Sequence, residues 1–88
     1  MVSATVTVTN SSGLHARPAN VFVKEALLNS GCSISINKDG KSYNGKSIVS
    51  VLSACIKCGT QIEISVEGDG EQQVLENLVT LIETGLNE

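Results

Sequence analysis

The stretch QIEISVE, residues 61–67, alternates between apolar and polar side chains. A period of two predicts a β-strand with one buried and one wet face. Residues 2–9 and 32–37 repeat the pattern, and the hairpin signal Asp39-Gly40 predicts a short returning strand over residues 41–43. Strands that each keep one wet face are typical of an antiparallel sheet that is covered on one side only.

Helical periodicity fills the intervals between these strands. We expect the first helix to begin near residues 15–16, and Ser47 to cap a second helix from Ile48 to about Cys58. Apolar residues between Val74 and Ile82 mark a third helix, which Gly85 ends. The buried face of the first helix is expected to contain Ala19, Phe22, Val23, Ala26 and Leu27. The order β-α-β-β-α-β-α predicts a two-layer α+β domain, with the helices on one face of a four-stranded antiparallel sheet.

The 88 residues carry a net charge of −3 that is unevenly distributed. All six Lys and Arg side chains lie in residues 17–57, whereas residues 61–88 hold seven acids and no cation. An acidic third would repel nucleic-acid phosphates, and with only 2% aromatic residues the chain has almost no stacking platform for single strands. We therefore expect no direct nucleic-acid binding, although the basic part could hold a small anion.

The compartment is expected to be the cytoplasm. Residues 2–9 alternate and do not form the apolar core of a signal peptide, and no run approaches the length of a membrane span. Three cysteines cannot form a closed disulfide framework, and we expect them to stay reduced.

The only His, the only Arg and the only Pro of the chain fall within the stretch from Gly13 to Pro18, at the expected start of a helix. Unpaired amides at a helix start favour anions, and Arg17 can add a fork of donors to phosphate oxygens. The imidazole of His15 has a nitrogen that could attack a phosphoryl donor. The alternative is that His15 is a polar residue at a helix cap and that Arg17 is a solvated charge.

Residues 40–47, GKSYNGKS, match the phosphate-binding loop pattern G-x-x-x-x-G-K-[ST]. We reject that interpretation because Gly40 lies in a predicted hairpin and a strand separates it from Gly45. Ser47 remains an N-cap, or a phosphorylation site at which a phosphate would lie beside Lys46.

The C-x-x-C pair of Cys55 and Cys58 could indicate redox or zinc chemistry. The pair is placed at a helix C-terminus, where the helix dipole does not activate a thiol. A zinc site would need Cys32 and His15 to converge with the pair, although they bracket opposite ends of the first helix. We expect no metal, and we interpret the cysteines as packing or incidental residues.

The second helix has more apolar residues than one buried face can use. If Val51 faces the sheet together with the two cysteines, Ile48, Val49 and Leu52 form an exposed apolar patch beside Ser47. The alternative is that this helix is simply buried more deeply.

The segments GLHARP (residues 13–18) and GKSI (residues 45–48) resemble the active-site motif and the regulatory serine segment of the histidine-containing phosphocarriers, the HPr family of the bacterial sugar phosphotransferase system. The resemblance covers essentially the whole chain and favours the Gram-positive branch. It implies one HPr-like domain over residues 1–88, an open-faced sandwich with sheet order 1-4-2-3, no cofactor and a monomeric state.

The resemblance also implies roles for individual residues. His15 would accept a phosphoryl group at Nδ1 from phosphorylated enzyme I and pass it to sugar-specific IIA proteins, so the chain would be a carrier and not an enzyme. Arg17 and the amides of Ala16 and Arg17 would stabilise the transferring oxygens. Ser47 would be phosphorylated by the HPr kinase/phosphorylase, and that form would bind a catabolite-control transcription factor. The partner-docking residues would be Asn20, Lys24, Ile48, Val49 and Leu52.

The chain departs from the family pattern at two docking positions. Val49 stands where a larger Met or Phe is common, and Asn20 where a small residue or Thr is usual. Two relatives of other kinds compete with the sugar carrier: a purely regulatory homologue, which would lack the histidine, and a nitrogen-branch carrier, which the segment Lys46-Ser47-Ile48 disfavours.

Overall fold

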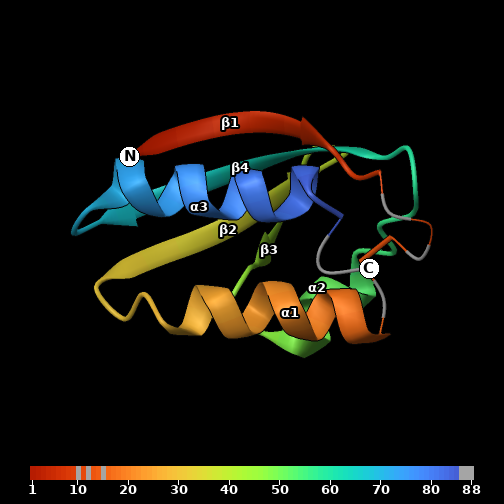
Figure 1. The fold of residues 1–88 in the computed structure, drawn as a ribbon, viewed down its shortest axis with the longest axis horizontal. Coiled ribbons are helices and arrows are strands. Elements are labelled where there is room, and N and C mark those ends of the chain that lie inside the picture. The colour runs from red at the N-terminus through yellow and green to blue at the C-terminus, as the bar shows by residue number, and fades with distance from the viewer. Residues whose placement is uncertain (10, 12, 15, 86–88) are drawn as a thin grey trace.

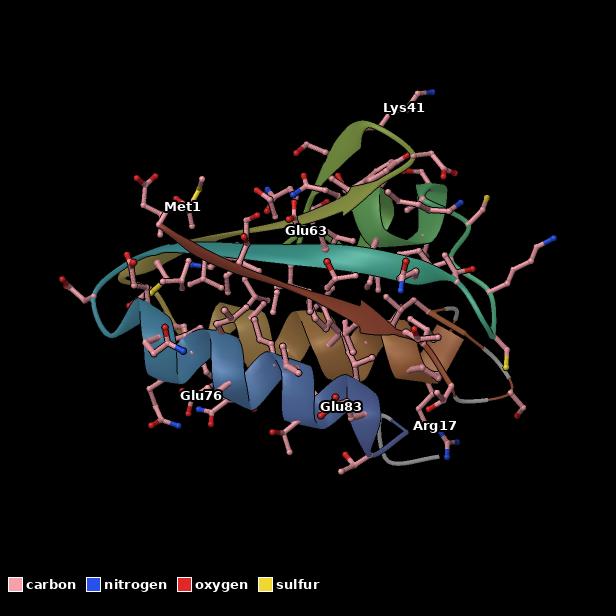
Figure 2. The ribbon with its side chains drawn as sticks, turned by 90° about the horizontal axis from the view of Figure 1, so that it is seen from above. Met1, Arg17, Lys41, Glu63, Glu76 and Glu83 are labelled. Atoms are coloured by element: carbon pink, nitrogen blue, oxygen red, sulfur yellow. The ribbon has the colours of Figure 1, made fainter. Side chains whose placement is uncertain are left out.

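The computed structural model describes residues 1–9, 11, 13–14 and 16–85, which form a four-stranded sheet and three helices (Figure 1). The sheet order is β1-β4-β2-β3 and every strand pair is antiparallel. The helices cover one face of the sheet and the other face is open (Figures 1 and 2). The predicted order, pairing and layers are therefore confirmed. The elements in chain order are β1 (Val2–Thr7), α1 (Ala16–Leu27), β2 (Cys32–Lys38), β3 (Lys41–Asn44), α2 (Ile48–Ser53), β4 (Gln61–Gly68) and α3 (Glu71–Glu83).

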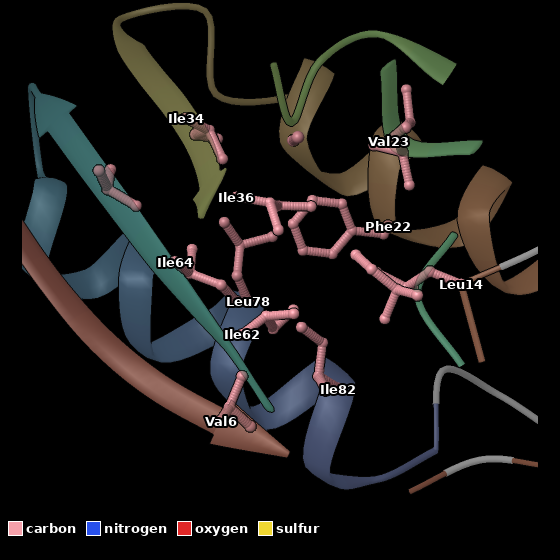
Figure 3. Packing of buried hydrophobic residues seen from close by; sticks show 14 of the residues in the cluster. Val6, Leu14, Phe22, Val23, Ile34, Ile36, Ile62, Ile64, Leu78 and Ile82 are labelled. Atoms are coloured by element: carbon pink, nitrogen blue, oxygen red, sulfur yellow. The ribbon is translucent and has the colours of Figure 1, made fainter. Parts of the chain in front are cut away.

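The core lies between the sheet and the helices, and the alternation of the strands fills it. Ile62, Ile64 and Val66 of β4 are almost fully buried and point toward the helices, whereas the residues between them face the open side. Phe22 of α1 lies among Ile36, Leu14 and the other buried side chains (Figure 3). Each fully buried aliphatic or aromatic side chain stabilises the fold by about 1.5–3 kcal/mol.

Helix α2 is shorter than the sequence predicts: it ends at Ser53 and not near Cys58. The amide of Cys55 donates to the carbonyl of Leu52 at 3.2 Å, and Cys55 itself has a left-handed φ of 53°. The chain then places the fully buried Ile56 in the core. Burial of Ile56 and its backbone contact with the loop before α1 override the helical propensity of the segment. Of the three residues expected to face the sheet, only Val51 does, since Cys55 and Cys58 are exposed.

The unequal charge along the sequence becomes a division in space. Helix α3 packs on β1 and β4, whereas α1 and α2 pack together and α2 contacts β3 (Figure 1). One half of the molecule therefore contains α1, α2 and β3 with Arg17, Lys24, Lys41 and Lys46. The other half contains β1, β4 and α3, which together carry carboxylates and no Lys or Arg. Among the described residues, no helix is long and apolar enough to cross a membrane.

Candidate functional site

The loop that leads into α1 is held against the segment that follows α2. The amide of Leu14 donates to the carbonyl of Ile56 at 2.9 Å, and the Leu14 side chain is fully buried. Gly13 has φ +62°, and a Cβ atom there would lie 2.3 Å from the carbonyl oxygen of Ile56 and 2.8 Å from Cα of Lys57. Only glycine fits this close approach. His15 lies outside the described residues, so its predicted position is not tested.

The start of α1 presents Arg17 to solvent. The helix begins at Ala16, as the sequence predicts, and the Pro18 and Ala19 side chains are buried while that of Arg17 is exposed. No residue in the first turn of α1 is acidic. The first amides of a helix lack intrahelical acceptors and the helix dipole is positive at that end, so this end of α1 suits an anion. Because the Arg17 side chain is already exposed, its guanidinium can bind such an anion without first moving out of the core.

The five predicted docking residues lie on two helices that pack against each other. On α1, Asn20 and Lys24 are both exposed and are one turn apart. On α2, Val49 is 73% exposed and Leu52 is 37% exposed, whereas Ile48 is half-buried. We call Asn20, Lys24, Ile48, Val49 and Leu52 the docking patch. The expected exposed apolar surface is present at Val49 and Leu52, and Ile48 contributes only part of its side chain.

The structure adds one apolar residue to the surroundings of the docking patch. The helical periodicity predicts Leu27 in the buried face of α1, but its side chain is 56% exposed. It is the last residue of the helix and follows Asn20 and Lys24 at helical spacing, so it continues their exposed stripe. The spacing from Asn20 and Lys24 is the signal in the sequence that indicates an exposed Leu27. The prediction that Leu27 is buried is wrong because α1 ends before the core can cover this position.

Ser47 caps α2, as predicted. Its backbone is extended, and its Oγ accepts a hydrogen bond from the amide of Ser50 at 3.3 Å. The side chain is partly exposed. Lys46 reaches the end of α1, where its Nζ donates to the carbonyl of Asn29 at 2.8 Å. Lys46, the residue before Ser47 in the sequence, therefore fastens the start of α2 to the end of α1.

Residues 40–47 do not have the geometry of a phosphate-binding loop. Gly40 lies in the turn between β2 and β3 with φ +80°, and β3 separates it from Gly45. Gly45 is itself buried, and a Cβ atom there would lie 2.7 Å from Cγ2 of Ile34. Both glycines thus serve the hairpin and its packing, and the rejection of the motif is confirmed.

The cysteines lie in different environments. Cys32 is buried, and its thiol donates to the carbonyl of Asp69 at 3.0 Å. Cys55 and Cys58 are exposed, and the Cys58 thiol lies 3.6 Å from the carbonyl oxygen of Thr9. All three are free thiols. Within the part of the chain that the structure describes, no three His, Cys, Asp or Glu residues are grouped so that they could hold a metal ion.

Comparison with known proteins decides the family. A family model described as the PTS HPr component phosphorylation site matches residues 2–84. The chain belongs to the HPr family. The HPr phosphocarrier of Haemophilus influenzae is 43% identical over 84 residues, which cover 96% of this chain and 98% of that protein. The HPr-like protein Crh of Bacillus subtilis is 37% identical over 83 residues, covering 94% of this chain and 96% of the relative.

Solved HPr structures show the same fold. A crystal structure of HPr-C-His from Thermoanaerobacter tengcongensis matches with a TM-score of 0.95 at 40% identity and covers 100% of this chain and 98% of its own. Membership of the HPr family carries the role of a phosphocarrier in the phosphotransferase system. An HPr dimer from the same organism matches with a TM-score of 0.78 at 40% identity over the full length of both chains. The expected monomeric state is therefore open.

Proposed function

We propose that this chain is a cytoplasmic phosphocarrier in which His15 accepts a phosphoryl group from phosphorylated enzyme I and passes it to sugar-specific IIA proteins. The observation that carries the proposal is the family model for an HPr phosphorylation site over residues 2–84, in a chain with one histidine. The exposed Arg17 and the anion-favouring start of α1 support the same position.

The proposed transfer needs little from the carrier itself. A lone pair of the neutral His15 imidazole attacks phosphorus, a nitrogen–phosphorus bond forms, and the bond between phosphorus and enzyme I breaks. Arg17 and the backbone amides of Ala16 and Arg17 would stabilise the transferring oxygens. A carrier must also release the group. An open helix end holds phosphate more loosely than an enclosed pocket, and each partner supplies the rest of the site.

A two-step relay tests this function. Enzyme I with labelled phosphoenolpyruvate should place one phosphoryl group on the chain, and a purified IIA protein added afterwards should remove it. Both steps follow from a carrier that meets its two partners one after the other. Radiolabel on the separated proteins is the measurement. A chain that is labelled and keeps its label in the presence of several IIA proteins would contradict the carrier function.

We propose further that Ser47 is the regulatory phosphorylation site of an HPr kinase/phosphorylase. A phosphate on its partly exposed Oγ would lie beside Lys46 and at the edge of the docking patch. It would add about −1.5 to −2 charges there, which should weaken the approach of acidic partner surfaces. The same new charge offers a catabolite-control transcription factor a feature that the unmodified chain lacks.

The Ser47 assignment predicts the outcome of a kinase assay. The kinase with ATP should label the wild type and should not label Ser47→Ala. Loss of the cap by alanine costs about 1 kcal/mol, so Ser47→Asn serves as a second variant that keeps a capping side chain and cannot be phosphorylated. Ser53→Ala, also on α2, should be labelled normally. Label that persists in both Ser47 variants would place the modification elsewhere.

The docking patch predicts the effect of a charge at its centre. Val49→Glu should weaken enzyme I binding by about tenfold or more, because it places a charge in an apolar contact. Stability should change by less than about 0.5 kcal/mol, since Val49 is 73% exposed. Gln73→Glu on α3 is the matched control, because it adds the same charge at an exposed position in the other half of the molecule. Isothermal titration gives both affinities; equal affinities would remove the patch from the interface.

A purely regulatory role is the second candidate, because the HPr-like Crh protein is among the relatives. Such a protein would act through phosphorylated Ser47 alone. The presence of His15 favours the carrier, since homologues of the regulatory kind lack the histidine. The relay experiment separates the two candidates: a regulatory protein would be labelled by the kinase and not by enzyme I.

A further inference from the structure

Strand β1 is an edge strand with a free hydrogen-bonding side. Within the part of the chain that the structure describes it pairs only with β4, and in Figure 1 its ribbon forms the upper border of the sheet. The amide of Val8 donates to the carbonyl of Thr60 at 2.9 Å, and the carbonyl of Val8 accepts from Gly59 at 2.7 Å. In an antiparallel ladder the direction of these groups repeats every second residue. The backbone groups of Ser3, Thr5 and Thr7 therefore point outward from the edge.

The edge has none of the usual protection against a further strand. The six residues of β1, VSATVT, include no charge and no proline. Natural edge strands are commonly blunted by lysines, prolines or bulges because an open edge pairs with any extended chain. This edge is chemically suited to accept one.

A groove lies directly beside the free edge, between β1 and α3, which run side by side in Figures 1 and 2. Its volume is about 530 Å³. Its apolar floor includes the half-buried Val2, Ala4 and Val79, and its rim is polar. A strand added to β1 would direct every second side chain toward this groove.

The charged side chains of β1, β4 and α3 are all acidic, and the N-terminal ammonium beside β1 is paired with Glu71. Glu76 lies on the groove rim, where Gln72 donates to its Oε2 at 3.0 Å. Glu63 lies on the open face of the sheet, in register with Thr5. The Glu71 carboxylate accepts a hydrogen bond from the amide of Gly68 and pairs with the N-terminal ammonium, which is 3.1 Å away. These two contacts, the first more than the second, hold the pKa of Glu71 below its usual value. Since β1, β4 and α3 contain no Lys or Arg, Glu63 and Glu76 have no cationic side chain on these elements.

We propose that the edge groove, formed by β1 and the facing side of α3, binds an extended peptide segment of a partner protein in which apolar residues alternate with Lys or Arg. The peptide backbone bonds to Ser3, Thr5 and Thr7 as a fifth strand. Its apolar side chains enter the groove over Val79, its cations extend over the open face toward Glu63, and Glu76 on the groove rim adds to the negative potential that attracts the peptide. A second copy of this chain fits less well, because its own β1 offers no cation. This surface lies in the acidic half of the molecule, away from the docking patch, so a peptide could bind without occluding the carrier site.

The test titrates the ¹⁵N-labelled chain with a capped peptide of four Lys-Val repeats and follows the amide spectrum. Shifts should concentrate in residues 2–7 and 72–80. A peptide of the same composition with its lysines and valines in two blocks should bind at least about fivefold more weakly, because it lacks the alternation. A peptide of four Glu-Val repeats should show no saturable binding, because Glu63 and Glu76 repel it.

Two substitutions test the contacts separately. Thr5→Pro removes an outward amide without breaking the bonds to β4, and should weaken binding about tenfold. Glu76→Lys should weaken it about fivefold, whereas Glu25→Lys on α1, with the same charge change, should not alter it. Acceptance of a phosphoryl group from enzyme I should be unchanged in all three, which keeps this test independent of the carrier function.

Four results would overturn the proposal: no saturable shifts with the Lys-Val peptide, shifts centred on α1 and α2, binding that neither Thr5→Pro nor Glu76→Lys weakens, or a dimer without peptide whose contacts map to β1. The last result would assign the edge to a second copy of the chain.

Discussion

We expect His15→Ala to lower phosphoryl acceptance from phosphorylated enzyme I by at least about a thousandfold, because the proposed nucleophile is gone and no other imidazole exists in the chain. Arg17→Ala should slow acceptance by roughly 10- to 100-fold, since charge-assisted hydrogen bonds to the transferring oxygens are lost while the nucleophile remains. Initial rates of label incorporation measure both effects.

The control for these variants is Lys41→Ala, which removes an exposed cation from β3, away from the start of α1. Its acceptance rate should equal that of the wild type. Thermal unfolding of each variant excludes loss of the fold as the cause. If Lys41→Ala and Arg17→Ala reduced the rate equally, net positive charge and not a positioned guanidinium would explain the effect.

The second large effect is expected at Gly13, which holds the loop before the proposed nucleophile. In Gly13→Ala the new Cβ would meet backbone atoms of Ile56 and Lys57, which cannot move aside cheaply, and the φ of +62° adds strain. We expect a loss of about 3 kcal/mol of unfolding free energy, or roughly 12–24 °C in Tm for a chain of this size. The contact between Leu14 and Ile56 should shift, so phosphoryl acceptance should fall even in the folded fraction.

Two other glycines separate the causes of that effect. Gly40→Ala has a comparable positive φ and no atom within 4 Å of the new Cβ, so only the backbone strain of about 1 kcal/mol should appear. Gly68→Ala would clash with the carbonyl oxygen of Gly31 at 2.1 Å, at the turn between β4 and α3. It should destabilise the chain as Gly13→Ala does, yet leave acceptance by the folded fraction unchanged. Equal loss of acceptance in both variants would mean that global stability, and not the loop, governs the transfer.

The strands could be predicted because the apolar residues that alternate along each strand are the residues that the fold buries. Ile62, Ile64 and Val66 are apolar since they face the helices, and the wet residues between them face the open side. The cap at Ser47 could be predicted for a similar reason, because a hydroxyl before an apolar run satisfies a free helix amide locally. Such features depend on few neighbours in space.

The errors arose where distant contacts decide the structure. The end of α2 depends on Ile56 entering the core and on its carbonyl accepting from Leu14, which is 42 positions earlier in the sequence. The exposure of Leu27 depends on how far α1 extends past the core. Neither contact leaves a periodic trace in the sequence. The motif around His15 was recognisable by its chemistry, whereas the edge groove exists only after β1 and α3 have packed together.

The most direct test of the central claim is to locate the phosphoryl group on the ¹⁵N-histidine-labelled chain after incubation with enzyme I and phosphoenolpyruvate. Imidazole nitrogen shifts by NMR and the intact mass, before and after mild acid, identify the bond. The account predicts one phosphoryl group, bonded to Nδ1 of His15 and lost in acid. An acid-stable phosphate on a hydroxyl, or no incorporation by a folded chain, would contradict it.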